Sequence, residues 1–202
     1  MKIFAVIHNY GPACPDSPMG EGAAGWYTMP DSAIMHTGNP LFVPVGDGAR
    51  PEAFASVAWR CERLGKSIPA RFAGRYLKAV AAAFAIVDSA LLTRLRETGL
   101  PWSEATASDR ACVVGNFQPI STLVYNRGFR VTCGGSAFDY DPALIRRPVE
   151  SLLPRISDSV TLKTGDIILA ALTPRGIPLE PGSRLTATDI QTDTNLIDIN
   201  IR

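Results

Sequence analysis

The sequence lacks a long apolar segment and a surplus of charge of either sign. Its longest uninterrupted apolar stretch, residues 79–87, is far shorter than the roughly 20 residues that a helix needs to cross a bilayer. The net charge is +1, whereas proteins that bind nucleic acids or anionic membranes usually carry a basic patch. We therefore expect neither a membrane nor a nucleic acid as a partner.

Cysteine and histidine are also scarce, with 4 and 2 residues respectively. Cys14, Cys61, Cys112 and Cys133 form no Cys-x-x-Cys pair, which argues against a structural zinc site. Isolated thiols are typical of a reducing compartment. In addition, the apolar run near residue 1 is too short for a signal peptide. These features predict a cytoplasmic protein.

The composition itself is that of an ordinary globular domain. The chain has 202 residues, of which 46% are hydrophobic and 19% charged. This length suffices for one well-buried core and is short for two typical domains. We expect a single domain over residues 1–202.

Short apolar runs between turn-forming residues predict mainly β-structure. Helices are predicted from an N-cap at Ser67, over residues 89–98 with a leucine stripe, and over residues 149–156. The alanine-rich residues 79–88 favour a helix by propensity but permit a strand. Strands are predicted over residues 3–7, 41–45, 54–61, 167–172, 183–188 and 196–201, and a hairpin over residues 124–132 around Asn126, Arg127 and Gly128.

The most informative segment spans residues 161–187. Gly165 and Asp166 end a polar turn, a buried apolar run follows, and Thr173, Pro174 and Gly176 form a second turn. Turns at the end of a strand present backbone N–H groups and hydroxyls, and ligands are often held there.

This segment resembles the C-terminal signature of the fumarylacetoacetate hydrolase family. Other motifs that are similar to the family occur in the same order along nearly the whole chain. The resemblance implies an α+β, predominantly β fold of packed mixed β-sheets with a few short helices, a strand over residues 79–88, and a homodimer. The matching residues are Asn9, Tyr10, residues 29–33, residues 63–66, residues 95–102, Ser157, Leu162, Gly165, Asp166, Thr173, Pro174 and Gly176.

The resemblance also implies a divalent cation held by a Glu-x-Glu strand and an Asp on a neighbouring strand. Counted from the motifs, these three positions fall on Phe54, Ser56 and Ala85. A phenyl ring and a methyl group cannot bind a hard cation, and a lone hydroxyl binds it poorly. The sequence therefore predicts neither a metal nor another cofactor.

The catalytic positions of the family are neutral here as well. The histidine that follows Asn-Tyr corresponds to Ala13, and two lysines correspond to Met29 and Thr106. We interpret the chain as an inactive or diverged member that binds a small organic acid or a partner protein in the former active-site cleft. The candidate cleft residues are His8, Asn9, Tyr10, Ala13, Met29, Phe54, Ser56, Ala85, Thr106 and Thr173.

The alternative interpretation is a hydrolase, decarboxylase or isomerase that acts on 2,4-dioxo or 2-oxo acids through a rebuilt site. Its metal ligands would be Glu52, Asp88, Asp109 and His8, although Asp88 also suits the N-cap of the following helix. A third possibility is a structural subunit that pairs with an active paralogue. A thiol nucleophile formed by Cys14 and His8 lacks the third group that would orient the base.

Overall fold

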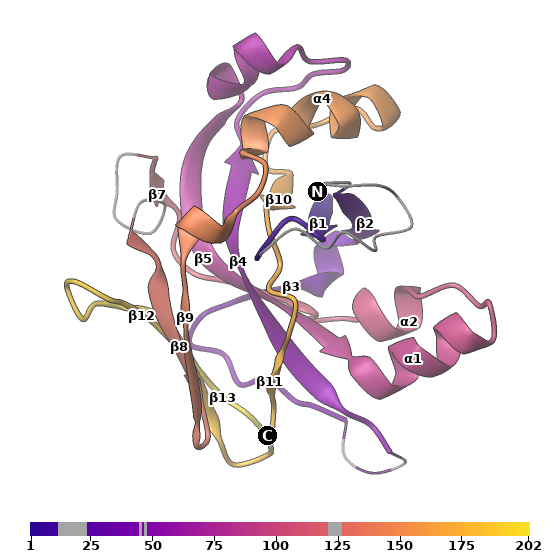
Figure 1. The fold of residues 1–202 in the computed structure, drawn as a ribbon, viewed down its shortest axis with the longest axis vertical. Helices are drawn as coiled ribbons and strands as arrows, with labels where there is room; N and C mark the ends of the chain where they lie inside the picture. The colour runs from indigo at the N-terminus through magenta and orange to yellow at the C-terminus, as the bar shows by residue number, and fades with distance from the viewer. Residues whose placement is uncertain (12–23, 45, 47, 121–126) are drawn as a thin grey trace.

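A computed structural model of the chain describes residues 1–11, 24–44, 46, 48–120 and 127–202. It contains two β-sheets with a few short helices packed around them (Figure 1). The fold class expected from the sequence, predominantly β with mixed pairing, is confirmed. No helix in the described ranges is long and apolar enough to cross a membrane.

The larger sheet is built around one long antiparallel strand pair. Strands β4 (Pro51–Cys61) and β5 (Leu77–Asp88) run side by side through its centre (Figure 1). Pairing is parallel between β1 and β10 and between β3 and β6, and antiparallel elsewhere. The strand order is β2 (Gly25–Met29), β1 (Ile3–Ile7), β10 (Ile167–Leu169), β4, β5, β6 (Cys112–Val114) and β3 (Ile34–His36), with β11 (Ile177–Pro178) on β4 and β7 (Gln118–Pro119) on β5.

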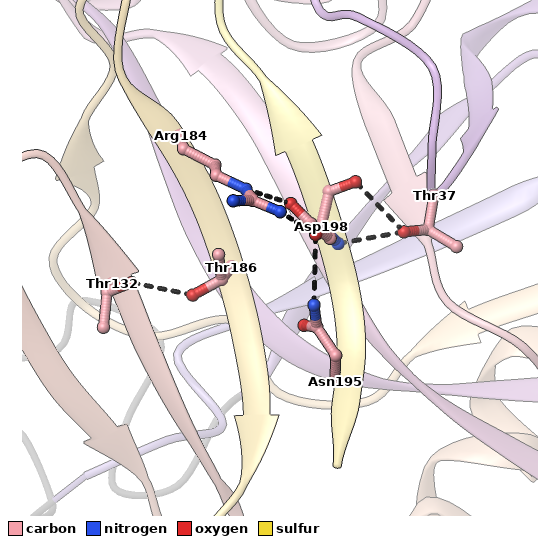
Figure 2. Close-up of polar contacts among 6 residues, drawn as sticks. All are labelled: Thr37, Thr132, Arg184, Thr186, Asn195 and Asp198. Carbon is pink, nitrogen blue, oxygen red and sulfur yellow. Dashed lines mark hydrogen bonds and ion pairs between the residues drawn. The ribbon is translucent and has the colours of Figure 1, made fainter. Parts of the chain in front are cut away.

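The smaller sheet has four antiparallel strands, formed by two hairpins that pair side by side, and its outer face is polar. Its order is β13 (Asn195–Asn200), β12 (Arg184–Asp189), β8 (Phe129–Cys133) and β9 (Ser136–Tyr140). Asp198 pairs with Arg184 and accepts a hydrogen bond from Asn195, while its backbone N–H donates to Thr37 Oγ1 over 2.9 Å (Figure 2). The Thr37 contact ties this sheet to the segment that follows β3.

Three α-helices lie in the described ranges, together with short 3₁₀ turns. Helices α1 (Ser89–Glu97) and α2 (Ser103–Thr106) lie close together beside β5 (Figure 1). Helix α4 (Val149–Ser159) packs on the 3₁₀ turn η2 (Ala70–Arg75). The remaining 3₁₀ turns are η1 (Asp31–Ala33) and η3 (Pro142–Leu144).

The two faces of β4 and β5 enter two different hydrophobic clusters, because side chains alternate along a strand. Ala55, Val57 and Trp59 belong to the larger cluster, which also holds residues of the smaller sheet and of α4. Phe54 and Ala58 face the smaller cluster, which continues through Ala81, Ala83 and Ala85 of β5 and also contains Met29 and Cys112. Phe54 and Ala85, two of the positions that the resemblance assigns to metal ligands, lie on this second face.

Most of the predicted elements are confirmed, including the strand over residues 79–88 and the helices over residues 89–98 and 149–156. The leucine stripe is only partly buried, since Leu95 alone among its members is fully packed. Propensity favoured a helix at residues 79–88, but burial on both faces of the sheet selected a strand.

Two local predictions are wrong. Residues 41–44 form only an isolated bridge from Leu41 to Ile201, and Pro44 has no N–H with which to extend it. Ser67 caps no helix: it has φ +47°, and η2 begins after Pro69. The first strand of the hairpin predicted over residues 124–132 falls on residues 124–126, which lie outside the described ranges, and β8 pairs with β9 through a turn at residues 134–135. A Gly-Gly pair is itself a strong hairpin signal.

Asp166 of the signature fastens the start of β1 to the turn before β10. Its side chain is fully buried; Oδ1 accepts the Lys2 N–H over 2.8 Å, and Oδ2 accepts the Lys163 N–H over 2.8 Å. Lys2 Nζ lies 2.7 Å from Oδ2. The carboxylate is therefore saturated by structural partners.

We predict that Asp166→Ala lowers the free energy of unfolding by about 3 kcal/mol, because it strands two backbone donors and one ammonium group. Urea denaturation measures the loss. Asp109→Ala, which removes an exposed carboxylate with no partner in the described structure, is the matched control. A loss below about 1 kcal/mol for Asp166→Ala would contradict this role.

Candidate functional site

The three positions that the resemblance assigns to metal carboxylates are neighbours in the large sheet. Phe54 pairs directly with Ala85 across the β4–β5 ladder, and Ser56 is paired with Ala83. Phe54 and Ala85 both pack in the smaller cluster, where they present a ring and a methyl group. The Ser56 hydroxyl is fully buried; it donates to the Val57 carbonyl over 3.2 Å and accepts the Ala171 N–H over 3.1 Å.

The carboxylates of the alternative, rebuilt metal site do not converge. Glu52 accepts a hydrogen bond from Ser89 and lies 3.6 Å from Arg50. Asp88 Oδ1 accepts the N–H groups of residues 90 and 91 and is the N-cap of α1, as the sequence indicated. Asp109 and His8 are exposed. Within the described ranges, no group of three or more His, Cys, Asp or Glu residues could hold a metal, so a divalent cation does not fit these residues.

Asn9 joins the end of β1 to two distant segments. Its amide donates to the carbonyls of Arg147 over 3.0 Å and Ala170 over 2.8 Å, and its Oδ1 accepts the Arg147 N–H over 3.0 Å. Tyr10 beside it accepts the Asp141 N–H over 2.7 Å and packs against Tyr140 with ring centroids 4.8 Å apart. Both side chains are therefore used in hydrogen bonds within the fold.

The Thr173 hydroxyl is also used in hydrogen bonds within the fold and is not a free group at the end of the strand. Its Oγ1 accepts the Ala55 N–H over 3.1 Å and donates to the Arg175 carbonyl over 3.0 Å. Gly176 comes so close to β4 that an added Cβ would lie 2.6 Å from Glu52 Cβ and 2.9 Å from the Phe54 ring. The turn is therefore shaped by its fit to β4.

A pocket of about 330 Å³ lies between β2 and the start of α2. It contains Thr106, which was expected in the cleft; Met29, also expected there, is not in the lining and is fully buried in the smaller cluster. The Thr106 hydroxyl donates to the Trp102 carbonyl over 2.9 Å. Ala13 lies outside the described ranges. The lining residues are Trp26, Tyr27, Thr28, Pro101, Trp102, Ser103 and Thr106.

Tyr27 is the polar residue of this pocket that sequence analysis missed. Its hydroxyl is buried and has no hydrogen-bond partner in the described part of the chain. Burial raises the pKa of Tyr27 well above its usual value, and the nearby Cys112 thiol raises it further. Burial also raises the pKa of Cys112 to about 12. Both groups are therefore neutral at physiological pH, and Tyr27 retains an unused donor.

Solved structures with the same arrangement of strands identify the fold. A fumarylacetoacetate hydrolase family protein from Yersinia pestis superposes with a TM-score of 0.85 at 18% identity, covering 100% of this chain and 93% of that one. The chain has the fumarylacetoacetate hydrolase fold. Fumarylpyruvate hydrolase from Pseudomonas aeruginosa, solved in complex with Mn²⁺ and pyruvate, gives a TM-score of 0.83 at 20% identity, covering 100% of this chain and 89% of that one. These likenesses confirm the resemblance seen in the sequence.

Two curated relatives of this hydrolase-fold chain are oxaloacetate tautomerases. The mitochondrial enzyme of Saccharomyces cerevisiae is 32% identical over 120 residues, which are 52% of this chain and 44% of the relative. The Escherichia coli enzyme is 25% identical over 205 residues, 93% of this chain and 87% of the relative. The match therefore spans less than half of the yeast protein. No family model matches the chain.

We predict that Thr173→Val destabilises the protein by about 1–3 kcal/mol, because valine keeps the shape of threonine but leaves the buried Ala55 N–H without its acceptor. Thermal unfolding in parallel with Thr161→Val, an exposed position, measures the difference. Equal stability of the two variants would show that the hydroxyl is not needed by the fold.

Proposed function

We propose that the chain is an isomerase that interconverts the enol and keto forms of a small 2-oxo acid in the pocket between β2 and α2. The observation that carries the proposal is the similarity to the oxaloacetate tautomerase of E. coli, which extends over 93% of the chain. The yeast relative is also named an oxaloacetate tautomerase. A solved structure with a similar fold contains pyruvate, which is itself a 2-oxo acid.

In this reaction, Tyr27 donates a hydrogen bond to the substrate oxygen on which negative charge develops. In the conversion of enol to keto form, the enol O–H bond breaks, a C–H bond forms at the adjacent carbon, and negative charge develops on the oxygen. A preorganised neutral donor beside that oxygen stabilises the charge. The Tyr27 hydroxyl has no acceptor among the described residues and is buried near Cys112, so this hydrogen bond requires the substrate oxygen to reach the buried hydroxyl from the pocket that Tyr27 lines.

The proton that reaches carbon comes from water in this scheme. The pocket lining contains hydroxyls and aromatic rings but no carboxylate or imidazole. Water therefore gives a proton to carbon, and the proton of the enol oxygen returns to solvent. Tyr27 remains protonated throughout and acts only by hydrogen bonding.

Arg96 provides the positive charge that attracts an oxo acid to this uncharged pocket. Its guanidinium carbon lies 4.8 Å from the ring centroid of Trp102, and Trp102 lines the pocket. A cation held against an aromatic face keeps a defined position. We assign Arg96 to the substrate carboxylate at the rim.

We predict that Tyr27→Phe lowers kcat for oxaloacetate enol–keto conversion by about 100-fold, the usual effect of losing a donor to a developing oxyanion. Ultraviolet absorbance of the enol follows the rate, after dialysis against a chelator so that no stray divalent cation contributes. Tyr76→Phe, which changes a tyrosine on the other side of the sheet, serves as the control and should keep the wild-type rate.

The stability of Tyr27→Phe separates catalysis from folding. Because the Tyr27 hydroxyl has no partner in the described structure, removing it should leave the free energy of unfolding unchanged or higher. An active wild-type protein whose rate is unaffected by Tyr27→Phe would rule out this role for the hydroxyl.

We also predict that Arg96→Glu raises KM for oxaloacetate by about tenfold with a smaller change in kcat, since the rim charge is reversed. Arg94→Glu is a close control, because both arginines lie in the last turn of α1 and affect its dipole alike. Steady-state kinetics at low ionic strength measure the difference. Equal KM values for the two variants would contradict the assignment.

A second candidate function is ligand binding without turnover, favoured by the residues at the family's metal positions. Phe54, Ser56 and Ala85 offer no carboxylate there, and the pocket nearby would hold a neutral or weakly polar ligand. Binding of pyruvate by calorimetry without any acceleration of tautomerisation would support this function over the first. The expected homodimer, a pairing with an active paralogue and a cytoplasmic location stay predictions.

A further inference from the structure

A larger pocket lies at the opposite end of the β4–β5 pair. Its volume is about 480 Å³, and its walls are the last residues of β4, the first residues of β5 and the short strand β7. The ladder places Arg60 opposite Ala79 at this end, whereas Phe54 and Ala85 lie toward the other. The two pockets share no lining residue.

Arg60 is held in place at the floor of this pocket. A β-bulge between Arg60 and Cys61 shifts the register of the ladder, and bulges redirect the side chains beside them. Arg60 Nε donates to Glu62 Oε1 over 2.8 Å, and the guanidinium carbon lies 5.0 Å from the Phe117 ring centroid. Glu62 therefore compensates the charge of Arg60.

Two further cations in the lining have no such compensation. Arg63 and Lys78 are exposed, and neither has a carboxylate partner in the described ranges. Close to them, Phe117 and Pro119 form an apolar wall. The pocket thus combines two uncompensated positive charges with one flat apolar surface.

We propose that this pocket binds a small organic dianion with a flat apolar body, such as an aromatic dicarboxylate or an aryl phosphate. Arg63 and Lys78 neutralise its two charges, and its ring lies against Phe117. Arg60 is a structural part of the pocket wall, because its own charge is already paired with Glu62. This site is separate from the isomerase pocket and does not depend on the proposed activity.

Phthalate is the probe for a dicarboxylate, and phenyl phosphate is the probe for an aryl phosphate. We expect isothermal titration calorimetry of the full chain at low salt to give a dissociation constant below about 1 mM for at least one of them. Whichever binds more tightly identifies the anionic group. Benzyl alcohol, which has the ring but no charge, should not bind.

Charge-reversal variants test the residues. We predict that Arg63→Glu and Lys78→Glu each weaken binding of the better probe about tenfold, by replacing attraction with repulsion at short range. Arg175→Glu changes an exposed arginine outside the pocket lining and should bind as the wild type does. Phe117→Leu should weaken phthalate or phenyl phosphate more than inorganic phosphate, because only the organic probes use the ring.

Failure of this proposal is distinguishable from failure of the proposed function. Arg63→Glu and Lys78→Glu should retain the tautomerase rate of the wild type, and Tyr27→Phe should retain dianion binding. The proposal is overturned if no probe binds, if benzyl alcohol binds equally, or if Arg175→Glu weakens binding as much as Arg63→Glu does. The last result would indicate a general response to net charge rather than a site.

Discussion

The described structure depends on the long antiparallel ladder between β4 and β5. Its register runs from Pro51 opposite Asp88 to Arg60 opposite Ala79, and the alternation of side chains sends one face into each hydrophobic cluster. A slip of one residue would exchange the two faces. The ladder therefore fixes which side chains can meet, and it separates the aromatic pocket near α2 from the basic pocket near β7.

The signature residues serve this architecture through saturated contacts. Asp166 anchors β1 to the turn before β10, Thr173 bonds the backbone of β4, and Gly176 leaves room for the Phe54 ring. These contacts hold β1, β4 and β10 in the arrangement of the fumarylacetoacetate hydrolase fold, and Phe54 and Ala85 place a ring and a methyl group at positions that the sequence resemblance assigns to metal ligands.

Local sequence patterns predicted β1 and α4, whereas the strand β5 was expected only from the family resemblance. The patterns failed where the partner of a segment is distant in the sequence. Leu41 exchanges backbone hydrogen bonds with residues 200 and 202 at the other end of the chain, so no local pattern could define its pairing. Thr106 lies in the lining of the α2 pocket, Met29 is buried in the smaller cluster, and the cleft expected from the sequence stays a prediction. Tyr27 was missed because one tyrosine in a strand has no motif around it.

The sequence by itself predicted the fold, through motifs that resemble the fumarylacetoacetate hydrolase family, and it determined that Phe54, Ser56 and Ala85 carry no carboxylate. Only the tertiary structure decided that the Tyr27 hydroxyl is buried without a partner near Cys112, and that Arg63 and Lys78 share a pocket with Phe117. These groups meet across strands that are remote in sequence. The periodicity of the sequence determines which face of a strand each residue occupies. The pairing of strands and the packing of helices determine which residues it contacts.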